Sequence, residues 1–270
     1  MTAYINAMLK VLILALFAAT PLCATTQDEV LSAEILPGWQ MQNGHHMAGL
    51  SLQLAPDWKT YWRSPGDAGI PPLFDWSGSQ NVRSVQVHWP SPVVFHSNGM
   101  QTIGYHEGVV LPLEVVPVDP GQPIVLAVQV DLGVCNKICM PAAVMMRADL
   151  AAPGKPDAAI DAALKSVPKT AGEAGLQAIS CVVEPIADGL RLTATLDLPR
   201  KGAAETVVFE TADRSVWVAE AQTRRDGRRL VSQTDLVASG GAPFSLDRSG
   251  VTVTVLADGR ATEIDGCPAP

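Results

Sequence analysis

The stretch LPLEVVPVDPGQPIVLAVQVDL, residues 111–132, contains two β-rich runs and the connection between them. Leu111 to Val118 and Ile124 to Leu132 are rich in valine, leucine and isoleucine, which favour strands. Between them, Asp119-Pro120-Gly121-Gln122-Pro123 is composed of residues typical of turns. The stretch therefore predicts two strands joined by a turn.

The surrounding sequence extends this β pattern over residues 28–150, which we expect to form one domain. Leu50 to Leu54 and Val82 to Trp89 alternate apolar and polar residues with the period of two that a half-buried strand shows. Prolines recur throughout the region and argue against long helices. Short strands with structured loops are typical of a β-sandwich.

A second β-rich region follows a change in composition. Residues 151–175 are rich in alanine, proline and glycine and predict a linker, with a short helix over Asp157 to Val167. Residues 176–267 return to alternation, as in Leu190 to Leu198 and Val251 to Val255. Asp-Gly pairs at 188–189, 226–227 and 258–259 suit hairpin turns. We expect a second β-sandwich here.

Composition narrows the class of protein. Of the 270 residues, 47% are hydrophobic and 17% are charged, which does not fit a disordered or fibrous chain. The formal net charge is −8, so no basic surface for nucleic acid is expected.

The N-terminus, residues 1–24, has the pattern of a secretory signal peptide. Lys10 supplies positive charge, Val11 to Ala19 is unbroken apolar sequence, and Thr20 to Ala24 offers a cleavage region. The apolar run is too short to span a bilayer, and Leu22 before Cys23 disfavours lipid attachment. No later segment is a membrane span by its hydropathy. We therefore expect a soluble, exported protein, located in a bacterial periplasm.

Four cysteines remain after signal removal: Cys135, Cys139, Cys181 and Cys267. Four cysteines allow three pairings, and export favours disulfides over metal ligation. A Cys181–Cys267 bond would close a long loop and act as a structural staple. A Cys135–Cys139 bond would close only a short loop and contribute little to stability, so it is either a minor structural bond or an easily reduced one.

Several motifs surround the first cysteine pair in the sequence: WKTYWRSPGDAGIPPLFDW at 58–76, Trp89-Pro90, Phe95, Gly104-Tyr105, Val110-Leu111-Pro112 and VCNKICMP at 134–141. Together they resemble the N-terminal periplasmic domain of the disulfide reductase DsbD, and most closely its ScsB (suppressor of copper sensitivity) branch. The resemblance covers most of residues 45–145. It implies an all-β protein, and we expect two immunoglobulin-like β-sandwich domains joined by a linker with a short helix.

The same resemblance implies site residues. Cys139 would form a mixed disulfide with a partner, and Cys135 would resolve it. Residues 93–106, including Phe95 and Tyr105, would form a cap loop that shields the sulfurs. The implied activity is that of an oxidoreductase of the protein-disulfide reductase type, without a cofactor.

Two departures from the family affect this assignment. The cysteines are closer together than in the best known DsbD domains. Those proteins also continue into a membrane electron carrier and a thioredoxin domain, whereas this sequence ends at residue 270. The expected partners are therefore a separate membrane electron carrier and a periplasmic thioredoxin-like or disulfide isomerase-like protein.

Other residues leave alternatives open. The aromatic residues between Trp58 and Trp76 either pack a core or partly border the cysteines, and Lys137 is either a solvated charge or favours a thiolate. Met41, His45, His46 and Met47 are soft ligands of the kind that binds copper. The rival interpretation is a non-enzymatic periplasmic binding module or copper chaperone linked to copper tolerance.

Overall fold

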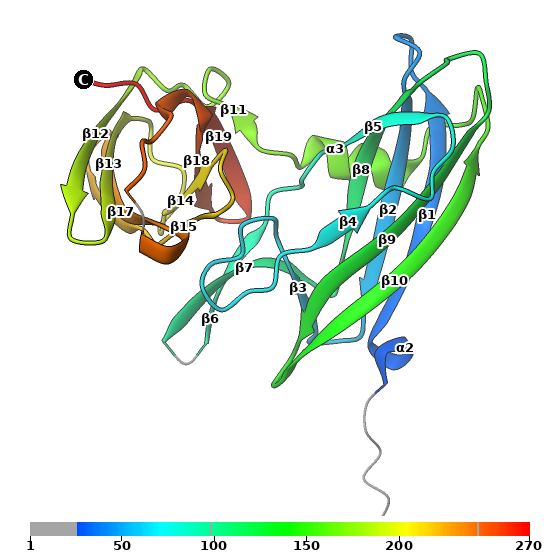
Figure 1. Cartoon of the computed structure of the whole chain (residues 1–270), viewed down its shortest axis with the longest axis horizontal. Coiled ribbons are helices and arrows are strands. Elements are labelled where there is room, and N and C mark those ends of the chain that lie inside the picture. Colours follow the sequence, from blue (N-terminus) through cyan, green and yellow to red (C-terminus); the bar gives the residue numbers. More distant parts are fainter. Residues whose placement is uncertain (1–25, 98, 242) are drawn as a thin grey trace, which may run out of the picture.

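The computed structural model describes residues 26–97, 99–241 and 243–270, and it consists of two immunoglobulin-like β-sandwich domains with a short helix between them (Figure 1). The predicted all-β fold class is confirmed. The predicted signal peptide and Cys23 lie outside the described residues.

The first sandwich contains two antiparallel sheets. One has the order β1-β2-β8-β5, and the other has the order β10-β9-β3-β7-β6, with β4 also paired to β9. A one-turn helix, α2 (Gln27–Val30), precedes them. The strands are β1 (Leu31–Gln40), β2 (His46–Leu54), β3 (Lys59–Tyr61), β4 (Leu73–Asp75), β5 (Val82–Val87), β6 (Val93–Ser97), β7 (Met100–His106), β8 (Gly108–Pro117), β9 (Ile124–Cys135) and β10 (Cys139–Leu150).

The second sandwich also contains two sheets. Their orders are β11-β19-β18-β14 and β12-β13-β17-β15, with β16 also paired to β17. The strands are β11 (Lys169–Thr170), β12 (Ala178–Ile186), β13 (Gly189–Asp197), β14 (Thr206–Thr211), β15 (Val216–Val218), β16 (Gln222–Asp226), β17 (Arg229–Ala238), β18 (Val251–Ala257) and β19 (Arg260–Asp265). Short 3-10 turns lie at Ser239–Gly241 and Arg248–Gly250.

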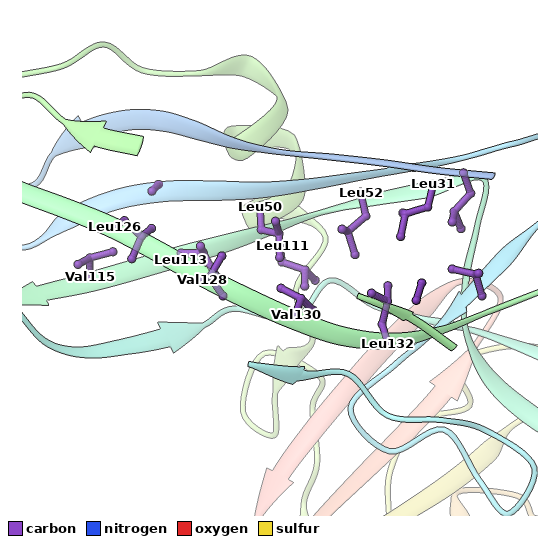
Figure 2. Packing of buried hydrophobic residues seen from close by; sticks show 14 of the residues in the cluster. Leu31, Leu50, Leu52, Leu111, Leu113, Val115, Leu126, Val128, Val130 and Leu132 are labelled. Atoms are coloured by element: carbon purple, nitrogen blue, oxygen red, sulfur yellow. The ribbon is translucent and has the colours of Figure 1, made fainter. Parts of the chain in front are cut away.

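The core of the first sandwich forms between β2 and β8 on one side and β9 on the other (Figure 2). The inward residues alternate along each strand, as the period of two requires. The labelled members of this buried set are Leu31, Leu50, Leu52, Leu111, Leu113, Val115, Leu126, Val128, Val130 and Leu132.

The two strands of residues 111–132 lie in different sheets, so their connection crosses between the layers of the sandwich. Asn81 holds this turn in place. Its side-chain amide donates to the carbonyls of Asp119 (2.9 Å) and Gln122 (3.0 Å), and its side-chain oxygen accepts from the Asp119 amide at 2.8 Å.

The segment between the sandwiches packs against both of them. Helix α3 (Ala158–Lys165) is capped by Asp157, whose carboxylate accepts from the amides of the first turn. Its Ile160 is fully buried and lies against Gly49 of β2, where a Cβ atom would approach the Ile160 side chain to 2.8 Å. Downstream, β11 pairs with β19, and Ala174 belongs to the second core. This packing restrains the predicted linker at both ends.

The two sandwiches also contact each other directly. Trp62, Ile103 and Tyr105 of the first sandwich form one buried cluster with Leu256 and Ala261 of the second. In Figure 1, β3, β7 and β6 lie on the side of the first sandwich that is nearest the second.

In the part of the chain that the structure describes, no helix has the length and apolar character needed to cross a membrane.

Removing the Cys181–Cys267 disulfide is expected to destabilise the protein strongly. The bond joins residues separated by 86 positions, and both cysteines are buried. The chain-entropy model gives about 4.6 kcal/mol for a loop of this length and about 2 kcal/mol for the Cys135–Cys139 loop. Urea unfolding followed by circular dichroism should therefore show a much larger decrease in midpoint for the Cys181→Ala/Cys267→Ala variant than for Cys135→Ser/Cys139→Ser. Equal decreases would contradict this difference.

Candidate functional site

A disulfide closes the turn between β9 and β10. Cys135 is the last residue of β9, Cys139 is the first of β10, and the two are direct partners in the antiparallel register, with their Cα atoms 4.1 Å apart. Within the turn, the Asn136 amide donates to the Ile138 carbonyl at 3.1 Å. The two cysteines differ in environment, because Cys135 is completely buried and Cys139 is exposed.

Strand alternation decides which way the disulfide faces. The even-numbered residues of β9, such as Val130 and Val134, face the core, so Cys135 lies on the opposite face. Lys59 of β3 is paired with both Cys135 and His106 of β7, and paired residues share a face of the sheet. We call this face of β9-β3-β7-β6 the outer face and the other the inner face.

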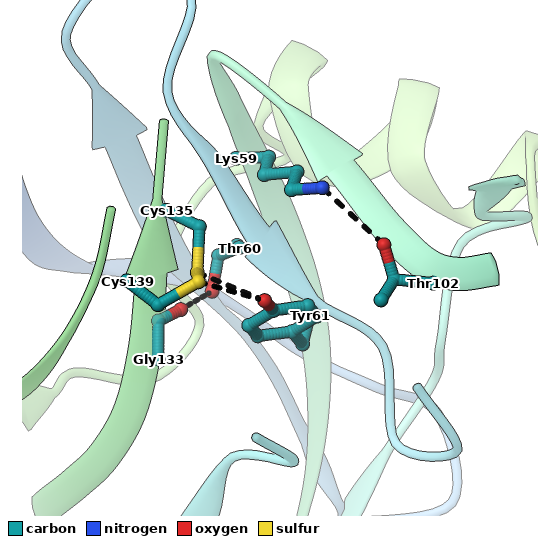
Figure 3. The surroundings of a disulfide bond; sticks show 7 residues. All are labelled: Lys59, Thr60, Tyr61, Thr102, Gly133, Cys135 and Cys139. Atoms are coloured by element: carbon teal, nitrogen blue, oxygen red, sulfur yellow. Dashed lines mark hydrogen bonds between the residues drawn. A yellow bond between two sulfur atoms is a disulfide. The ribbon is translucent and has the colours of Figure 1, made fainter. Parts of the chain in front are cut away.

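Tyr61 is the side chain that contacts both sulfurs. Its hydroxyl lies 2.8 Å from Cys135 Sγ and 3.4 Å from Cys139 Sγ, as Figure 3 shows. Because sulfurs in a disulfide carry no hydrogen, the hydroxyl is the donor. Tyr61 is 2% exposed, and this burial raises the pKa of its hydroxyl. The phenol is therefore a neutral donor at physiological pH.

Gly133 provides the space for the Tyr61 ring. A Cβ atom at this position would lie 3.0 Å from the Tyr61 ring and 2.8 Å from the Ile70 side chain. The Gly133 carbonyl also accepts a hydrogen bond from the Thr60 hydroxyl at 2.9 Å, which joins β3 to β9 at this point (Figure 3). The missing side chain thus lets Tyr61 lie across β9 and reach the sulfurs.

Lys59 brings a positive charge to the outer face. Its ammonium group donates to the Thr102 hydroxyl at 3.3 Å (Figure 3). The same group lies 4.7 Å from the centre of the Phe95 ring. Burial lowers the pKa of Lys59. Lys137 lies exposed in the turn between the cysteines.

Within residues 93–106, the segment expected as a cap loop, β6 (Val93–Ser97) and β7 (Met100–His106) pair in antiparallel fashion. Phe95 lies on the outer face, where its ring packs edge-on to His106 with centroids 4.5 Å apart. Tyr105 lies on the inner face, is 7% exposed, and donates from its hydroxyl to the Pro90 carbonyl at 2.8 Å. Alternation along β7 thus directs Tyr105 away from the disulfide, and of the two predicted cap residues only Phe95 shares its face.

The second disulfide, Cys181–Cys267, is enclosed in the core of the second sandwich. The amide of Cys181 donates to the Pro268 carbonyl at 2.7 Å, and the Arg248 guanidinium donates to the Cys181 carbonyl. Both cysteines are at most 1% exposed, so neither is accessible to another protein.

The four residues considered as copper ligands do not converge. His46 is buried and its Nε2 donates to the Pro37 carbonyl at 2.6 Å, while its neighbour Met47 projects from the other face of β2. His45 Nδ1 lies 2.6 Å from Glu114 Oε1. Met41 lies in the turn after β1. Within the described ranges, no group of three or more His, Cys, Asp or Glu residues could hold a metal ion.

Tyr61 and Gly133 are the site residues that sequence reasoning did not assign. Tyr61 stood in the aromatic segment that either packs a core or borders the cysteines, and the structure shows that it does both. The sequence feature that could have indicated Tyr61 was its position shortly after Trp58 in the aromatic segment. The pairing of β3 with β9, which brings Tyr61 to the sulfurs, is not visible in the sequence.

This chain is similar to a known protein family and to a solved structure. Residues 27–149 match the family described as thiol:disulfide interchange protein DsbD, N-terminal. The structure is similar to the crystal structure of the N-terminal periplasmic domain of ScsB from Proteus mirabilis, with a TM-score of 0.65 and 25% sequence identity. That alignment covers 91% of this chain and 96% of the ScsB chain. No match was found among curated protein sequences.

The disulfide of β9 and β10 thus lies within the matched residues, and the similarity to ScsB extends over both sandwiches. The resemblance to the N-terminal domain of DsbD that the sequence motifs predicted is therefore confirmed over residues 27–149.

Proposed function

We propose that this protein exchanges disulfides in the periplasm through Cys135 and Cys139, passing electrons between a donor and exported thiol proteins. The observation that carries the proposal is the asymmetry of the pair. Cys139 is exposed and Cys135 is buried beneath a tyrosine hydroxyl that donates to its sulfur. This arrangement gives an incoming thiolate one accessible sulfur and gives the departing sulfur a stabilising partner.

The first step is attack on the disulfide. A thiolate of the reduced donor bonds to Cys139 Sγ, the Cys139–Cys135 bond breaks, and its electron pair stays on Cys135 Sγ. Cys135 leaves as a thiolate and receives the hydrogen bond of Tyr61. Hydrogen bonds to ionised groups are stronger than those between neutral groups, so this contact strengthens as the bond breaks.

The second step releases the donor. Its second thiolate attacks its own sulfur in the mixed disulfide and expels Cys139 as a thiolate. The donor then carries a disulfide, and this protein carries two reduced cysteines, so two electrons have moved. The same steps in reverse reduce a disulfide of a recipient protein.

We expect the positive charge of Lys59, which lies on the same face of the sheet as Cys135 with its ammonium group directed to Thr102 and Phe95, to favour the thiolate. A positive charge near a cysteine lowers the thiol pKa, and Lys59 is the direct strand partner of Cys135. The exposed Lys137 adds to the same field from the turn. Phe95, which lies under the Lys59 ammonium group, shields this outer face until a partner docks.

The expected donor is a separate membrane electron carrier or a thioredoxin-like protein, and the expected recipients include disulfide isomerase-like proteins. The ScsB neighbour is described as a periplasmic domain, which supports the same compartment here. The cysteines themselves carry the electrons, so the exchange needs no cofactor.

Redox titration distinguishes exchange from a purely structural pair. The protein is equilibrated across glutathione buffers and its free thiols are alkylated and assigned by mass spectrometry. Cys135 and Cys139 should become reduced under conditions in which Cys181 and Cys267 stay fully oxidised, because only the first pair is accessible. Equal resistance of both bonds would reject exchange and favour the binding-module interpretation.

Single cysteine variants test the order of attack. We expect Cys135→Ser to accumulate a mixed disulfide with a thioredoxin whose resolving cysteine has been removed, because the exposed Cys139 stays reactive. Cys139→Ser should trap much less, since the remaining sulfur is buried. Non-reducing electrophoresis measures both, with Cys135→Ser/Cys139→Ser as the blank. The reverse preference would contradict the assigned roles.

Replacing Tyr61 by phenylalanine should raise the pKa of the Cys135 thiol. A hydrogen bond to a charged group contributes about 1.5–3 kcal/mol, which corresponds to about 1–2 pKa units. The pH dependence of alkylation measures this pKa in the reduced protein. Tyr105→Phe is the matched control, because it removes a 2.8 Å hydrogen bond to the Pro90 carbonyl on the inner face. An equal pKa change in both variants would exclude a specific role for Tyr61.

A further inference from the structure

The outer face of the β3-β7-β6 sheet carries the disulfide site, and its inner face carries the contact with the second sandwich. Ile103 and Tyr105 of β7 pack on the inner face with Trp62, which directly follows Tyr61. Leu256 and Ala261 of the second sandwich complete this buried cluster. The same short strands are therefore held by the second sandwich on one side and contact the sulfurs on the other.

Arg63 extends the contact with charge. Its Nε and Nη2 donate to the two carboxylate oxygens of Glu210 at 2.9 and 2.8 Å, and Nη2 also donates to Glu263 at 2.5 Å. The guanidinium lies over the Trp62 ring, 4.6 Å from its centre. Burial alone would lower the pKa of Arg63, but the hydrogen bonds and charges of Glu210 and Glu263 raise it. The arginine stays charged and bridges both glutamates.

A second polar contact lies nearby. The Trp217 Nε1 group donates to Asp67 Oδ1 at 3.2 Å. Arg63 and Asp67 both belong to residues 63–72, which we call the covering loop. Between this loop and the second sandwich lies an open cleft of about 470 Å³, lined among others by Arg63, Asp67, Glu210 and Trp217. The covering loop thus meets the second sandwich through a few polar contacts beside an open cleft.

The covering loop also lies against Tyr61. A Cβ atom at Gly69 would lie 3.0 Å from the Tyr61 ring, and one at Gly133 would lie 2.8 Å from Ile70, so the loop covers the tyrosine where it crosses β9. The carbonyl of Pro65 accepts from the Ile103 amide at 3.0 Å, which fixes the base of the loop to β7. The loop therefore packs directly on the Tyr61 ring.

We propose that the second sandwich positions the redox site. Glu210 and Glu263 act through Arg63, and Trp217 acts through Asp67, to hold the covering loop on Tyr61 and so keep its hydroxyl on the Cys135 sulfur. Arg63 is then a positioning residue, and the second sandwich sets the equilibrium between the disulfide and the dithiol. This inference rests on the exchange function proposed above.

The hydrogen bond from Tyr61 shifts the equilibrium between disulfide and dithiol in one direction. When Cys135 is reduced, the Tyr61 hydroxyl stabilises its thiolate more than it stabilises the disulfide sulfur. Loosening the covering loop weakens that hydrogen bond and disfavours the reduced form. The protein then becomes harder to reduce, although every residue that contacts the sulfurs is unchanged.

The test uses the full exported chain with Glu210→Gln/Glu263→Gln, which removes both charges that hold Arg63 and keeps the shapes of the side chains. The measurement is the equilibrium constant with reduced and oxidised glutathione, read from the alkylated fraction of Cys135 and Cys139. We expect the equilibrium constant for reduction to decrease about fivefold. This decrease is smaller than that expected for complete loss of the charge-assisted hydrogen bond from Tyr61 to Cys135, because the bond is weakened and not removed. Asp197→Asn is the control, since it breaks a salt bridge to Arg228 within the second sandwich.

The Tyr61→Phe background decides whether the effect passes through the tyrosine. Without the Tyr61 hydroxyl, the two glutamine substitutions should change the equilibrium constant less than about twofold, because interacting residues are not additive. A full decrease in this background would overturn the proposal, as would an unchanged constant in the protein that keeps Tyr61. Trp217→Phe, which removes only the donor to Asp67, gives a second and milder disturbance if the double variant folds poorly.

Failure of the exchange function itself is recognisable in the same experiment. In that case Cys135 and Cys139 of the unsubstituted protein resist glutathione at every ratio, and both proposals are rejected together. If the unsubstituted pair titrates and the glutamine variant titrates identically, the exchange function stands and only the positioning role is rejected.

Discussion

The register of β9 with β10 and β3 is the constraint on which the site depends. Along one edge β9 pairs with β10, which places Cys139 opposite Cys135, and along the other it pairs with β3, which places Lys59 opposite Cys135. A slip of one residue would turn Cys135 into the core and expose the residues that now fill it. Val128, Val130 and Leu132 are buried and prevent that slip. The strand register that packs the core is therefore the same register that assembles the site.

The two disulfides differ in their surroundings, and the surroundings determine which of them another thiol can reach. Cys181–Cys267 closes a long loop inside a core, so it restricts the unfolded chain and is protected from other thiols. Cys135–Cys139 closes a short loop, leaves one cysteine exposed and offers the other a hydroxyl donor. Loop length separates the stabilising bond from the weak one, but exposure and hydrogen bonding make the weak one suitable for exchange.

The small sheet of β3, β7 and β6 explains why the second sandwich matters to the first. Strands carry side chains on two faces. Here the outer face of the sheet lies beside the disulfide, and the inner face packs against the second sandwich. Tyr105 illustrates the division. The family resemblance placed it with Phe95 in a cap over the sulfurs, yet its position in β7 directs it into the buried cluster with Leu256. Residues from one short segment thus serve two different surfaces.

Sequence alone determined the all-β class, because the alternation in β2, β9, β13 and β18 is a local property that needs no knowledge of neighbours. Sequence also predicted a redox role for Cys135 and Cys139, through the short loop that a bond between them would close and through the resemblance of the motifs around Trp58 and Trp76 to DsbD. Only the tertiary structure decided that Tyr61 contacts the sulfurs and that Gly133 makes room for its ring. The tertiary structure also decided that Arg63, in the covering loop over Tyr61, contacts the second sandwich. These contacts link residues up to 200 positions apart, and their geometry arises from strand pairing and domain packing, which no local pattern encodes.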